Sequence, residues 1–296
     1  MARIDAHVHV FARESDQFPR VTDRYCPSDR EETVEKLIAT MEPHKIDGAV
    51  LVQIGGNNYE HHAYLIHCLE KYPDRFRGIA AISPRTPEPE PLMDRLTQTP
   101  GLIGFRLFAV GGPVDPFEPV DVEKLTTYRI WKHAAANDFV IWLYPPANQV
   151  HLVPHLLDVF PKIRVVVNHL GVCPGEGQAY RDAQGRPHIE TPAYNPAFHT
   201  TYRLSAYKNV AVKLSGQYAF SHEDYPYKDL TRWHNRLLAS YGSKRLMWAT
   251  DFPWILETPG YNPLTGIIQE LLPNLRAEEY ADIMGNTAKR FLDFPD

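Results

Sequence analysis

Two hydrophobic patterns alternate along the chain. Short runs rich in β-branched and aromatic residues predict strands, and between them apolar residues recur every three or four positions, which predicts helices. Eight runs of the first kind occur, at residues 3–10, 48–54, 77–83, 101–108, 139–145, 163–171, 209–216 and 245–253. Because strands that alternate with helices pair in parallel, the pattern predicts an α/β fold, the (β/α)8 or TIM barrel, as a single domain over residues 1–296.

An open, doubly wound sheet is the alternative arrangement of the same elements. That fold binds dinucleotides through a GxGxxG turn after the first strand, and the chain has no such turn there. One stretch, 171–203, breaks the alternation of strands and helices and is rich in glycine, proline and polar residues. We therefore expect it to be a loop insertion near the active face of the barrel and not a domain boundary.

The first crossover helix is predicted within residues 28–41. Ser28 stands three residues before Glu31, which is the spacing of a capping box and predicts that the helix opens there. One face of the stretch is apolar, as expected for a helix that packs on a sheet. The residues of that face are Val34, Leu37, Ile38 and Met41.

Composition narrows the class of protein. Of the 296 residues, 44% are hydrophobic and 23% are charged, and no apolar run is long enough to span a bilayer. The net charge of -5 comes without a basic cluster, so we expect a small-molecule partner and neither a nucleic acid nor a membrane. The first residues lack the apolar stretch of a secretory signal, which makes the cytoplasm the expected location. The three cysteines form no CxxC pair and are expected to be reduced thiols, and a homo-oligomer is left open.

The first predicted strand carries two histidines on one face. Side chains two positions apart point the same way in a strand, so Asp5, His7 and His9 are expected to face the barrel interior. Two imidazoles at this spacing, at the C-terminal end of a barrel strand, can converge on one divalent ion. The alternative is a pair of buried histidines satisfied by hydrogen bonds. The residues expected to face the surrounding helices are Ile4, Ala6, Val8 and Val10.

Two later strands end in polar residues where packing alone would favour aliphatic ones. Asn168 and His169 end one apolar run, and Asp251 ends another, directly before a turn-forming Phe-Pro pair. A buried carboxylate is costly unless it is paired or binds a metal. With His7 and His9, these residues predict an open metal site. Taken singly, His169 would be a core histidine and Asp251 a helix cap.

The segments DAHVHVF, NHLG, VKLSG, LMWATDFP and GNTAKRFL resemble the amidohydrolase superfamily, specifically its amidohydrolase-2 branch of TIM-barrel hydrolases and decarboxylases. The resemblance covers nearly the whole chain. The metal ligands that it implies are His7, His9, His169 and Asp251. Their nitrogen and oxygen ligand atoms favour Zn²⁺ or Mn²⁺ as the cofactor. The resemblance makes His169 and Asp251 the expected catalytic residues. The branch places its third histidine on the fifth strand, whereas the pattern here places it on the sixth.

The mechanism implied by the resemblance is the attack of water on an ester carbonyl. A divalent ion lowers the pKa of bound water to about 7. Asp251 orients that water, takes its proton and delivers the proton to the departing alkoxide. Some lactonases of the group are thought to work without a metal, with the same histidines and aspartate as acid, base and water-positioning groups.

Two chemistries compete within this branch. Its decarboxylases, which act on carboxymuconate semialdehyde or resorcylate-type acids, carry a histidine on the strand after the metal histidine, where this chain has VKLSG. Its lactonases, which open sugar-acid lactones, muconolactones or pyrone acids, are similar to VKLSG and ATDFP at the corresponding strands. The resemblance therefore favours a lactone hydrolase, with a decarboxylase as the alternative. A non-catalytic ligand-binding barrel is a third hypothesis, and a serine nucleophile is disfavoured because Ser215 lacks a GxSxG elbow.

Residues at or near the ends of five strands are candidate substrate contacts. Arg106 interrupts an apolar strand, and its guanidinium would bind the carboxylate of an acidic lactone, the alternative being an ion pair with a neighbouring strand. Tyr144 resembles a substrate-contacting tyrosine of lactonases, and its alternative is a packing role. The weaker candidates are Gln53, Lys213 and Trp254. The histidines of the predicted helices are expected on solvated faces: His61, His62, His67, His133, His151 and His155.

Overall fold

A computed structural model describes residues 2–172, 179–183, 186–189 and 197–295. Its main sheet has eight parallel strands, and each predicted run coincides with one of them. The strands are β1 (Ile4–Val8), β2 (Gly48–Val52), β3 (Phe76–Ala81), β4 (Leu102–Leu107), β5 (Val140–Leu143), β6 (Val165–Val167), β9 (Val210–Leu214) and β10 (Leu246–Trp248). The predicted TIM barrel is confirmed. His169 follows the sixth strand of the barrel, as the hydrophobic pattern placed it.

The barrel closes where its last strand meets its first. The strands pair in the order β1-β2-β3-β4-β5-β6-β9-β10, and a bridge between Val8 and Phe252 joins the two ends. The backbone N–H of His9 donates to the carbonyl oxygen of Phe252 at 2.7 Å, and the N–H of Asp251 donates to that of His7 at 3.0 Å. Closure of the barrel therefore places the two histidines beside the aspartate.

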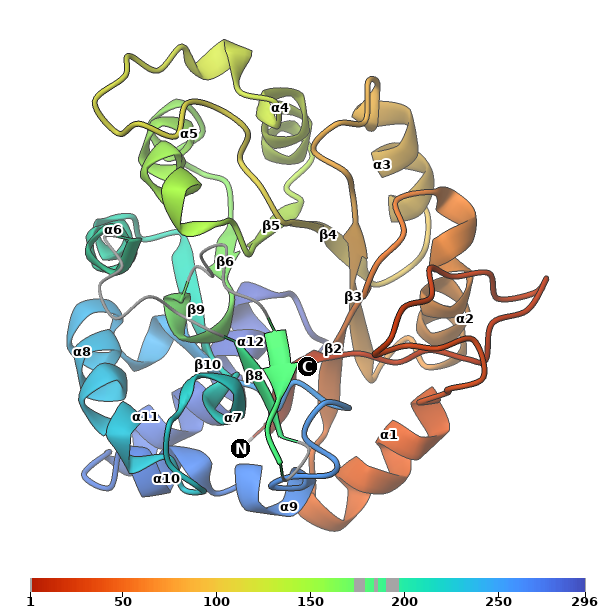
Figure 1. Cartoon of the computed structure of the whole chain (residues 1–296), viewed down its shortest axis with the longest axis vertical. Coiled ribbons are helices and arrows are strands. Elements are labelled where there is room, and N and C mark those ends of the chain that lie inside the picture. Colours follow the sequence, from red (N-terminus) through yellow and green to blue (C-terminus); the bar gives the residue numbers. More distant parts are fainter. Residues whose placement is uncertain (1, 173–178, 184–185, 190–196, 296) are drawn as a thin grey trace.

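Helices surround the ring of strands (Figure 1). They are α1 (Val34–Met41), α2 (Ala63–Lys71), α3 (Pro89–Thr97), α4 (Tyr128–Ala136), α5 (Val153–Val159), α6 (Ala197–Arg203), α7 (Gln217–Phe220), α8 (Thr231–Tyr241), α9 (Tyr261–Leu264), α10 (Ile267–Leu271), α11 (Ala277–Ala281) and α12 (Thr287–Phe291). The predicted opening of the first helix at Ser28 is wrong, because α1 begins at Val34 with Thr33 as its N-cap. The residues before it are extended, since Glu32 forms a bridge with Phe11.

Two apolar cores lie on the two sides of the sheet. One is drawn almost entirely from strands and fills the barrel, and the other joins the strands to the surrounding helices. The interior core consists of Ile4, Ala6, Val50, Val52, Ile79, Val140, Trp142, Val166, Ala211, Met247 and Ala249, with Ala288 and Leu292. Its last two members belong to α12 and the residue that follows it, so the C-terminal helix contributes to the interior core.

The predicted alternation of β1 is wrong in its first half. Ile4 and Ala6 belong to the interior core, although they were expected to face the helices. Asp5 was expected to face the interior, but its carboxylate accepts hydrogen bonds from the backbone N–H of Thr250 at 2.9 Å and from the hydroxyl of Tyr261 at 3.0 Å. The pairing with β2 shifts between Asp5 and Val8, where β1 holds one extra residue. Such a bulge reverses the alternation of faces beyond it.

The predicted insertion at 171–203 contains a small hairpin. Strands β7 (Ala179–Arg181) and β8 (Pro187–Ile189) pair antiparallel, and Figure 1 draws β8 in front of the ring of strands. Helix α6 ends the insertion. Residues 173–178, 184–185 and 190–196 of this segment, Cys173 included, lie outside the described part of the chain.

Two further expectations concern the chain as a whole. Cys26 and Cys68 are buried free thiols, as predicted. None of the helices among the described residues combines the length and the apolar character needed to cross a membrane.

Candidate active site

The four residues predicted as metal ligands meet at the C-terminal ends of the strands. His7 and His9 come from the end of β1, His169 follows β6, and Asp251 follows β10. The Oδ1 atom of Asp251 lies 3.4 Å from Nε2 of His7 and 3.5 Å from Nε2 of His9. Its Oδ2 atom lies 4.0 Å from Nδ1 of His169. All four side chains are buried, so one carboxylate is enclosed by three imidazoles.

Two of these residues have an uncommon backbone conformation. His169 has φ of 40° and Asp251 has φ of 67°, values that non-glycine residues seldom adopt. His169 stands two residues after the end of β6, and Asp251 stands three residues after the end of β10. Strain of this kind persists only where the surrounding structure holds it, and it is concentrated at functional sites.

The carboxylate of Asp251 is ionised at neutral pH. Burial raises its pKa, but His169, His9 and Tyr218 together outweigh burial and hold the pKa below its usual range. The hydroxyl of Tyr218 donates to Oδ2 at 2.6 Å, and burial raises the pKa of Tyr218 well above its usual value, so this hydroxyl keeps its proton. The Oδ1 atom is buried and receives no hydrogen bond of ordinary geometry from the described residues. One oxygen of the carboxylate therefore has no hydrogen-bond donor of ordinary geometry among these residues.

The three imidazoles are neutral at the same pH. Burial is the largest cause in each case: it lowers the pKa of His169 to about 3 and also lowers the pKa of His7 and of His9. Nδ1 of His169 lies 2.9 Å from the hydroxyl oxygen of Ser215. Burial, followed by the charge of Arg106, likewise lowers the pKa of Lys213 well below its usual value.

The two histidines of β1 have different neighbours. Nδ1 of His9 lies 2.6 Å from the carbonyl oxygen of Val52. Nδ1 of His7 accepts a hydrogen bond of 3.2 Å from the indole nitrogen of Trp142 and also contacts the amine of Lys213. The Nε2 atoms of the two rings lie 3.1 Å apart. An acceptor, the carbonyl of Val52, thus orients the ring of His9, and a donor, the indole N–H of Trp142, orients the ring of His7.

A divalent ion fits the distances at this site. One ligand atom each from His7, His169 and Asp251 lies within 4.8 Å of the others. In metal sites the second nitrogen of a ligating histidine usually donates to an acceptor, and the carbonyl of Val52 provides one for His9. Trp142 provides only a donor to His7. The distances between the ligand atoms therefore suit a metal ion. The hydrogen bond at His7 does not, because its second nitrogen accepts from Trp142 instead of donating to an acceptor.

A cavity of about 270 Å³ opens above the carboxylate. Asp251, His9 and His169 line it on the barrel side, and the β7–β8 hairpin lines it through Arg181, Pro187, His188 and Ile189. Of the predicted substrate contacts, Arg106, Tyr144 and Trp254 line the cavity. The insertion therefore lies at the candidate active site.

Arg106 is a buried cation in the wall of this cavity. Its guanidinium lies over the rings of Phe108, at 4.4 Å, and Tyr144, at 5.8 Å. Burial lowers its pKa to about 10, so it remains charged at neutral pH. Among the described residues it has no ion-pair partner, and its Nε–H donates a hydrogen bond to none of them. The ion pair that would give Arg106 a purely structural role is thus not found there.

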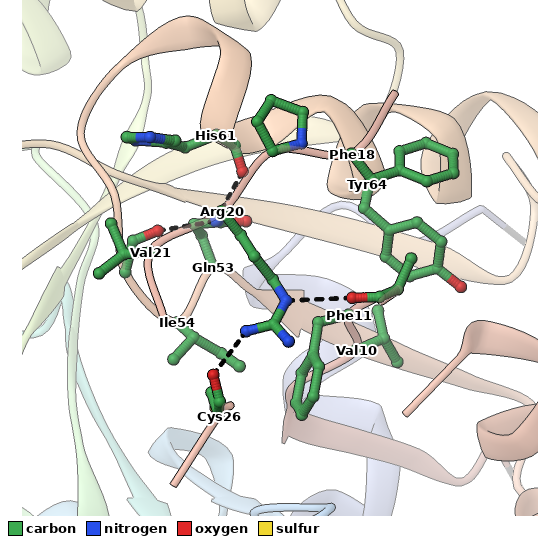
Figure 2. A pocket seen from close by; sticks show the side chains of 13 residues that line it. Val10, Phe11, Phe18, Arg20, Val21, Cys26, Gln53, Ile54, His61 and Tyr64 are labelled. Atoms are coloured by element: carbon green, nitrogen blue, oxygen red, sulfur yellow. Dashed lines mark hydrogen bonds between the residues drawn. The ribbon is translucent and has the colours of Figure 1, made fainter. Parts of the chain in front are cut away.

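Gln53 does not join the site. It lines a separate cavity of about 30 Å³ together with Arg20 and Tyr64 (Figure 2). The Nε2 of Gln53 donates to the carbonyl oxygens of Gly55 at 2.8 Å and His61 at 2.9 Å. Its amide holds the loop after β2, and a contact between Gln53 and the substrate stays a prediction.

The prediction for one histidine of the predicted helices is wrong. His62 was expected on a solvated face, yet it is fully buried. Its Nδ1 lies 2.8 Å from the carbonyl oxygen of Asn58, and its Nε2 accepts from the N–H of Ala81 at 3.0 Å. The ring joins the segment before α2 to the end of β3, a role that helical periodicity does not indicate.

Three residues of the site were missed or undervalued from the sequence. Tyr218, in α7, donates a hydrogen bond to Asp251, and Trp142, in β5, donates one to His7. In the sequence both are aromatic residues of apolar stretches, which gives no sign of a role in the site. Lys213 was a weak candidate although it is fully buried. The one available signal was a lysine in the middle of an apolar strand, since buried lysines are rare unless they have a partner.

A parallel barrel with a polar cluster of histidines and an aspartate at its C-terminal mouth defines a class of barrel enzymes. The family model described as amidohydrolase matches residues 4–294, and the chain belongs to this family, the amidohydrolase-2 family. No curated protein sequence matches the chain.

Solved structures with the same fold come from several bacteria. One is a probable 2-pyrone-4,6-dicarboxylic acid hydrolase of Acinetobacter baumannii with citric acid bound, with 22% identity, a TM-score of 0.74, and coverage of 99% of this chain and 100% of that one. Another is an amidohydrolase of Burkholderia multivorans with bound zinc, at 19% identity and a TM-score of 0.73, with both chains fully covered. A third is a 5-carboxyvanillate decarboxylase of Sphingomonas paucimobilis, at 14% identity and a TM-score of 0.65, with 99% of each chain covered. At these identities the likeness establishes the fold alone.

Proposed function

We propose that the protein is a lactone hydrolase whose substrate carries a carboxylate group. The observation that supports this most is the Oδ1 atom of Asp251, an ionised and buried carboxylate oxygen without a hydrogen-bond donor of ordinary geometry among the described residues. Asp251 borders a cavity of about 270 Å³ that is also lined by Arg106, for which the described residues provide no ion-pair partner. A base and an anion-binding group in one cavity suit the hydrolysis of an acidic ester.

In the proposed reaction, Asp251 is the general base. Water attacks the lactone carbonyl carbon while Oδ1 takes the water proton, and the carbonyl oxygen becomes an oxyanion. Imidazole N–H groups of the site stabilise that charge. When the ring C–O bond breaks, Asp251 returns the proton to the departing alkoxide. The product is a hydroxy acid, which ionises and releases one proton to solvent.

Arg106 is the proposed anchor for the substrate carboxylate. A buried guanidinium without a partner gains most from a ligand that supplies two oxygens in one plane. Its packing over Phe108 and Tyr144 fixes the plane of the guanidinium at the cavity wall. Trp254 and Tyr144 would contact the remainder of the ligand.

A zinc- or manganese-dependent form of the same reaction is the second candidate, favoured by the three ligand atoms within 4.8 Å. The predicted ligands, His7, His9, His169 and Asp251, would then hold the ion, which supplies an activated water when bound. Metal analysis after purification without chelators tests this. Less than one ion per ten chains, with no change of activity on adding zinc or manganese, would rule it out.

A substrate panel tests the reaction class. Sugar-acid lactones, muconolactones and pyrone dicarboxylates are incubated with the protein, and proton release is followed with a pH indicator. We expect at least one acidic lactone to be hydrolysed. Release of carbon dioxide from a carboxylated phenol, with every lactone inert, would establish the decarboxylase instead. Binding without turnover of either class would indicate a non-catalytic barrel.

A further inference from the structure

The positions of the protons on the two histidines of β1 follow from their neighbours. A backbone carbonyl only accepts hydrogen bonds, so Nδ1 of His9, 2.6 Å from the carbonyl oxygen of Val52, carries the proton of that ring. An indole nitrogen only donates, so Nδ1 of His7, 3.2 Å from Nε1 of Trp142, must present its lone pair. In a neutral ring the proton of His7 is then on Nε2.

The orientation of the rings supports this assignment. The planes of His7 and Trp142 differ by 23°, and their centroids lie 6.2 Å apart. With the two nitrogens only 3.2 Å apart, the rings meet at their edges, and the indole N–H points at the in-plane lone pair of Nδ1. Lys213 contacts the same nitrogen, but Trp142 occupies the lone pair whether the lysine amine is charged or neutral.

The contact between the two histidines agrees with the same assignment. With the proton of His7 on Nε2 and that of His9 on Nδ1, the 3.1 Å contact pairs one donor with one acceptor. The opposite assignment for His7 would set two lone pairs against each other across this contact. It would also set the N–H of His7 against the N–H of Trp142.

We infer that Trp142 is a positioning residue: it keeps the proton of His7 on Nε2, which makes His7 a hydrogen-bond donor in the site and lowers the affinity of the site for divalent ions. A metal needs a lone pair on the nitrogen that faces it, and His7 can offer one only by giving up the hydrogen bond from Trp142.

The test uses a substitution that changes no charge. Trp142→Phe removes the indole N–H and leaves an aromatic ring, so a gain in metal affinity would report the tautomer of His7 and not electrostatics. The matched control is Trp248→Phe, because Trp248 is also buried in a strand and donates its indole N–H to the carbonyl oxygen of Leu264 at 2.9 Å.

Two measurements are made on the full-length protein. Nitrogen-15 NMR of histidine-labelled wild type, with His7 assigned from the signal lost in His7→Gln, should show a protonated Nε2 and an unprotonated Nδ1. Calorimetric titration with zinc should show about tenfold tighter binding to Trp142→Phe than to wild type, the lower end of the change that metal-supporting residues produce. Trp248→Phe should bind zinc as wild type does.

Either measurement can overturn the inference. A protonated Nδ1 in wild-type His7 contradicts it directly and needs no variant, so failure of Trp142→Phe to fold leaves the test decisive. Equal zinc affinity of the two folded tryptophan variants also contradicts it. If no lactone is hydrolysed by wild type, the proposed function fails while the tautomer and the zinc affinities still stand or fall by themselves.

Discussion

Two layers of the barrel interior are equally buried and differ in chemistry. The lower layer is the interior core, which includes Ile4, Val50 and Met247 and has no charged member. The upper layer is the candidate active site, where Asp251 and Arg106 are nearly inaccessible to solvent. There the Oδ1 atom of Asp251 and the Nε atom of Arg106 have no hydrogen-bond partner of ordinary geometry among the described residues. Both layers come from the same strands, a few residues apart.

The difference shows that burial by itself does not identify a site. In the lower layer every buried side chain gains from being removed from water. In the upper layer, burial without full pairing costs free energy, because a buried charge loses its hydration. A fold retains such a cost where a ligand supplies the missing partners. Substitutions in the upper layer should therefore lower activity and change stability little, whereas those in the lower layer should lower stability and change activity little.

Asp251→Asn should have the largest effect. The amide keeps the size of the side chain but cannot take a proton, so we expect turnover of the lactone to fall by about 100- to 10,000-fold, the usual contribution of a general base. Substrate affinity and the free energy of unfolding should change little. Steady-state kinetics and urea unfolding measure both. Turnover within a few-fold of wild type would assign Asp251 a structural role.

Met247→Ala is the counterpart in the lower layer. The substitution leaves a cavity in the interior core, and we expect the free energy of unfolding to fall by about 2–5 kcal/mol. Turnover of the folded protein should remain near the wild-type value. If urea unfolding shows a small loss while turnover collapses, the two layers are not functionally separate.

The upper layer should also carry part of the pH dependence of stability. His169 has a pKa of about 3 when folded, against about 6.5 when unfolded, so below pH 6.5 the unfolded chain binds more protons. The stability from this residue is complete above pH 6.5 and is lost as the pH falls toward 3. Asp5 acts in the opposite direction, because burial raises its pKa to about 6.

The contribution of His169 is isolated by comparison with a variant. Between pH 7 and pH 5, the wild-type free energy of unfolding should fall by about 2 kcal/mol more than that of His169→Asn. Met247→Ala should follow wild type in this respect. Parallel curves for wild type and His169→Asn in urea titrations at the two pH values would contradict the assigned pKa.

Arg106→Met should have the smallest effect. Loss of the guanidinium should raise KM for an acidic lactone by about tenfold, the value of one charged hydrogen bond, and should leave KM for a neutral lactone unchanged. Because the arginine has no ion-pair partner among the described residues, its replacement should not lower the free energy of unfolding. Unfolding of the variant would instead assign Arg106 a structural ion pair.

The sequence by itself determined the barrel and the strand ends that form its candidate active site. The apolar runs are short, bounded and separated by amphipathic stretches, so all eight strands could be located from their period alone. His7, His9, His169 and Asp251 stood out because polar side chains at the ends of apolar strands need a reason to be there. Parallel strands bring such ends to one face of a barrel, which is a consequence of the fold and needs no distances.

Only the tertiary structure decided how these residues are paired. The bulge in β1 depends on register with β2, and it turned Asp5 away from the site toward Thr250 and Tyr261. The amide of Gln53 donates hydrogen bonds to two carbonyl groups of its own loop. Hydrogen bonds depend on distances of a few tenths of an ångström between residues far apart in the chain, and Trp142 and His7 are 135 positions apart. A local sequence pattern indicates which face of a strand a side chain occupies, but it does not indicate which atom of another residue the side chain contacts.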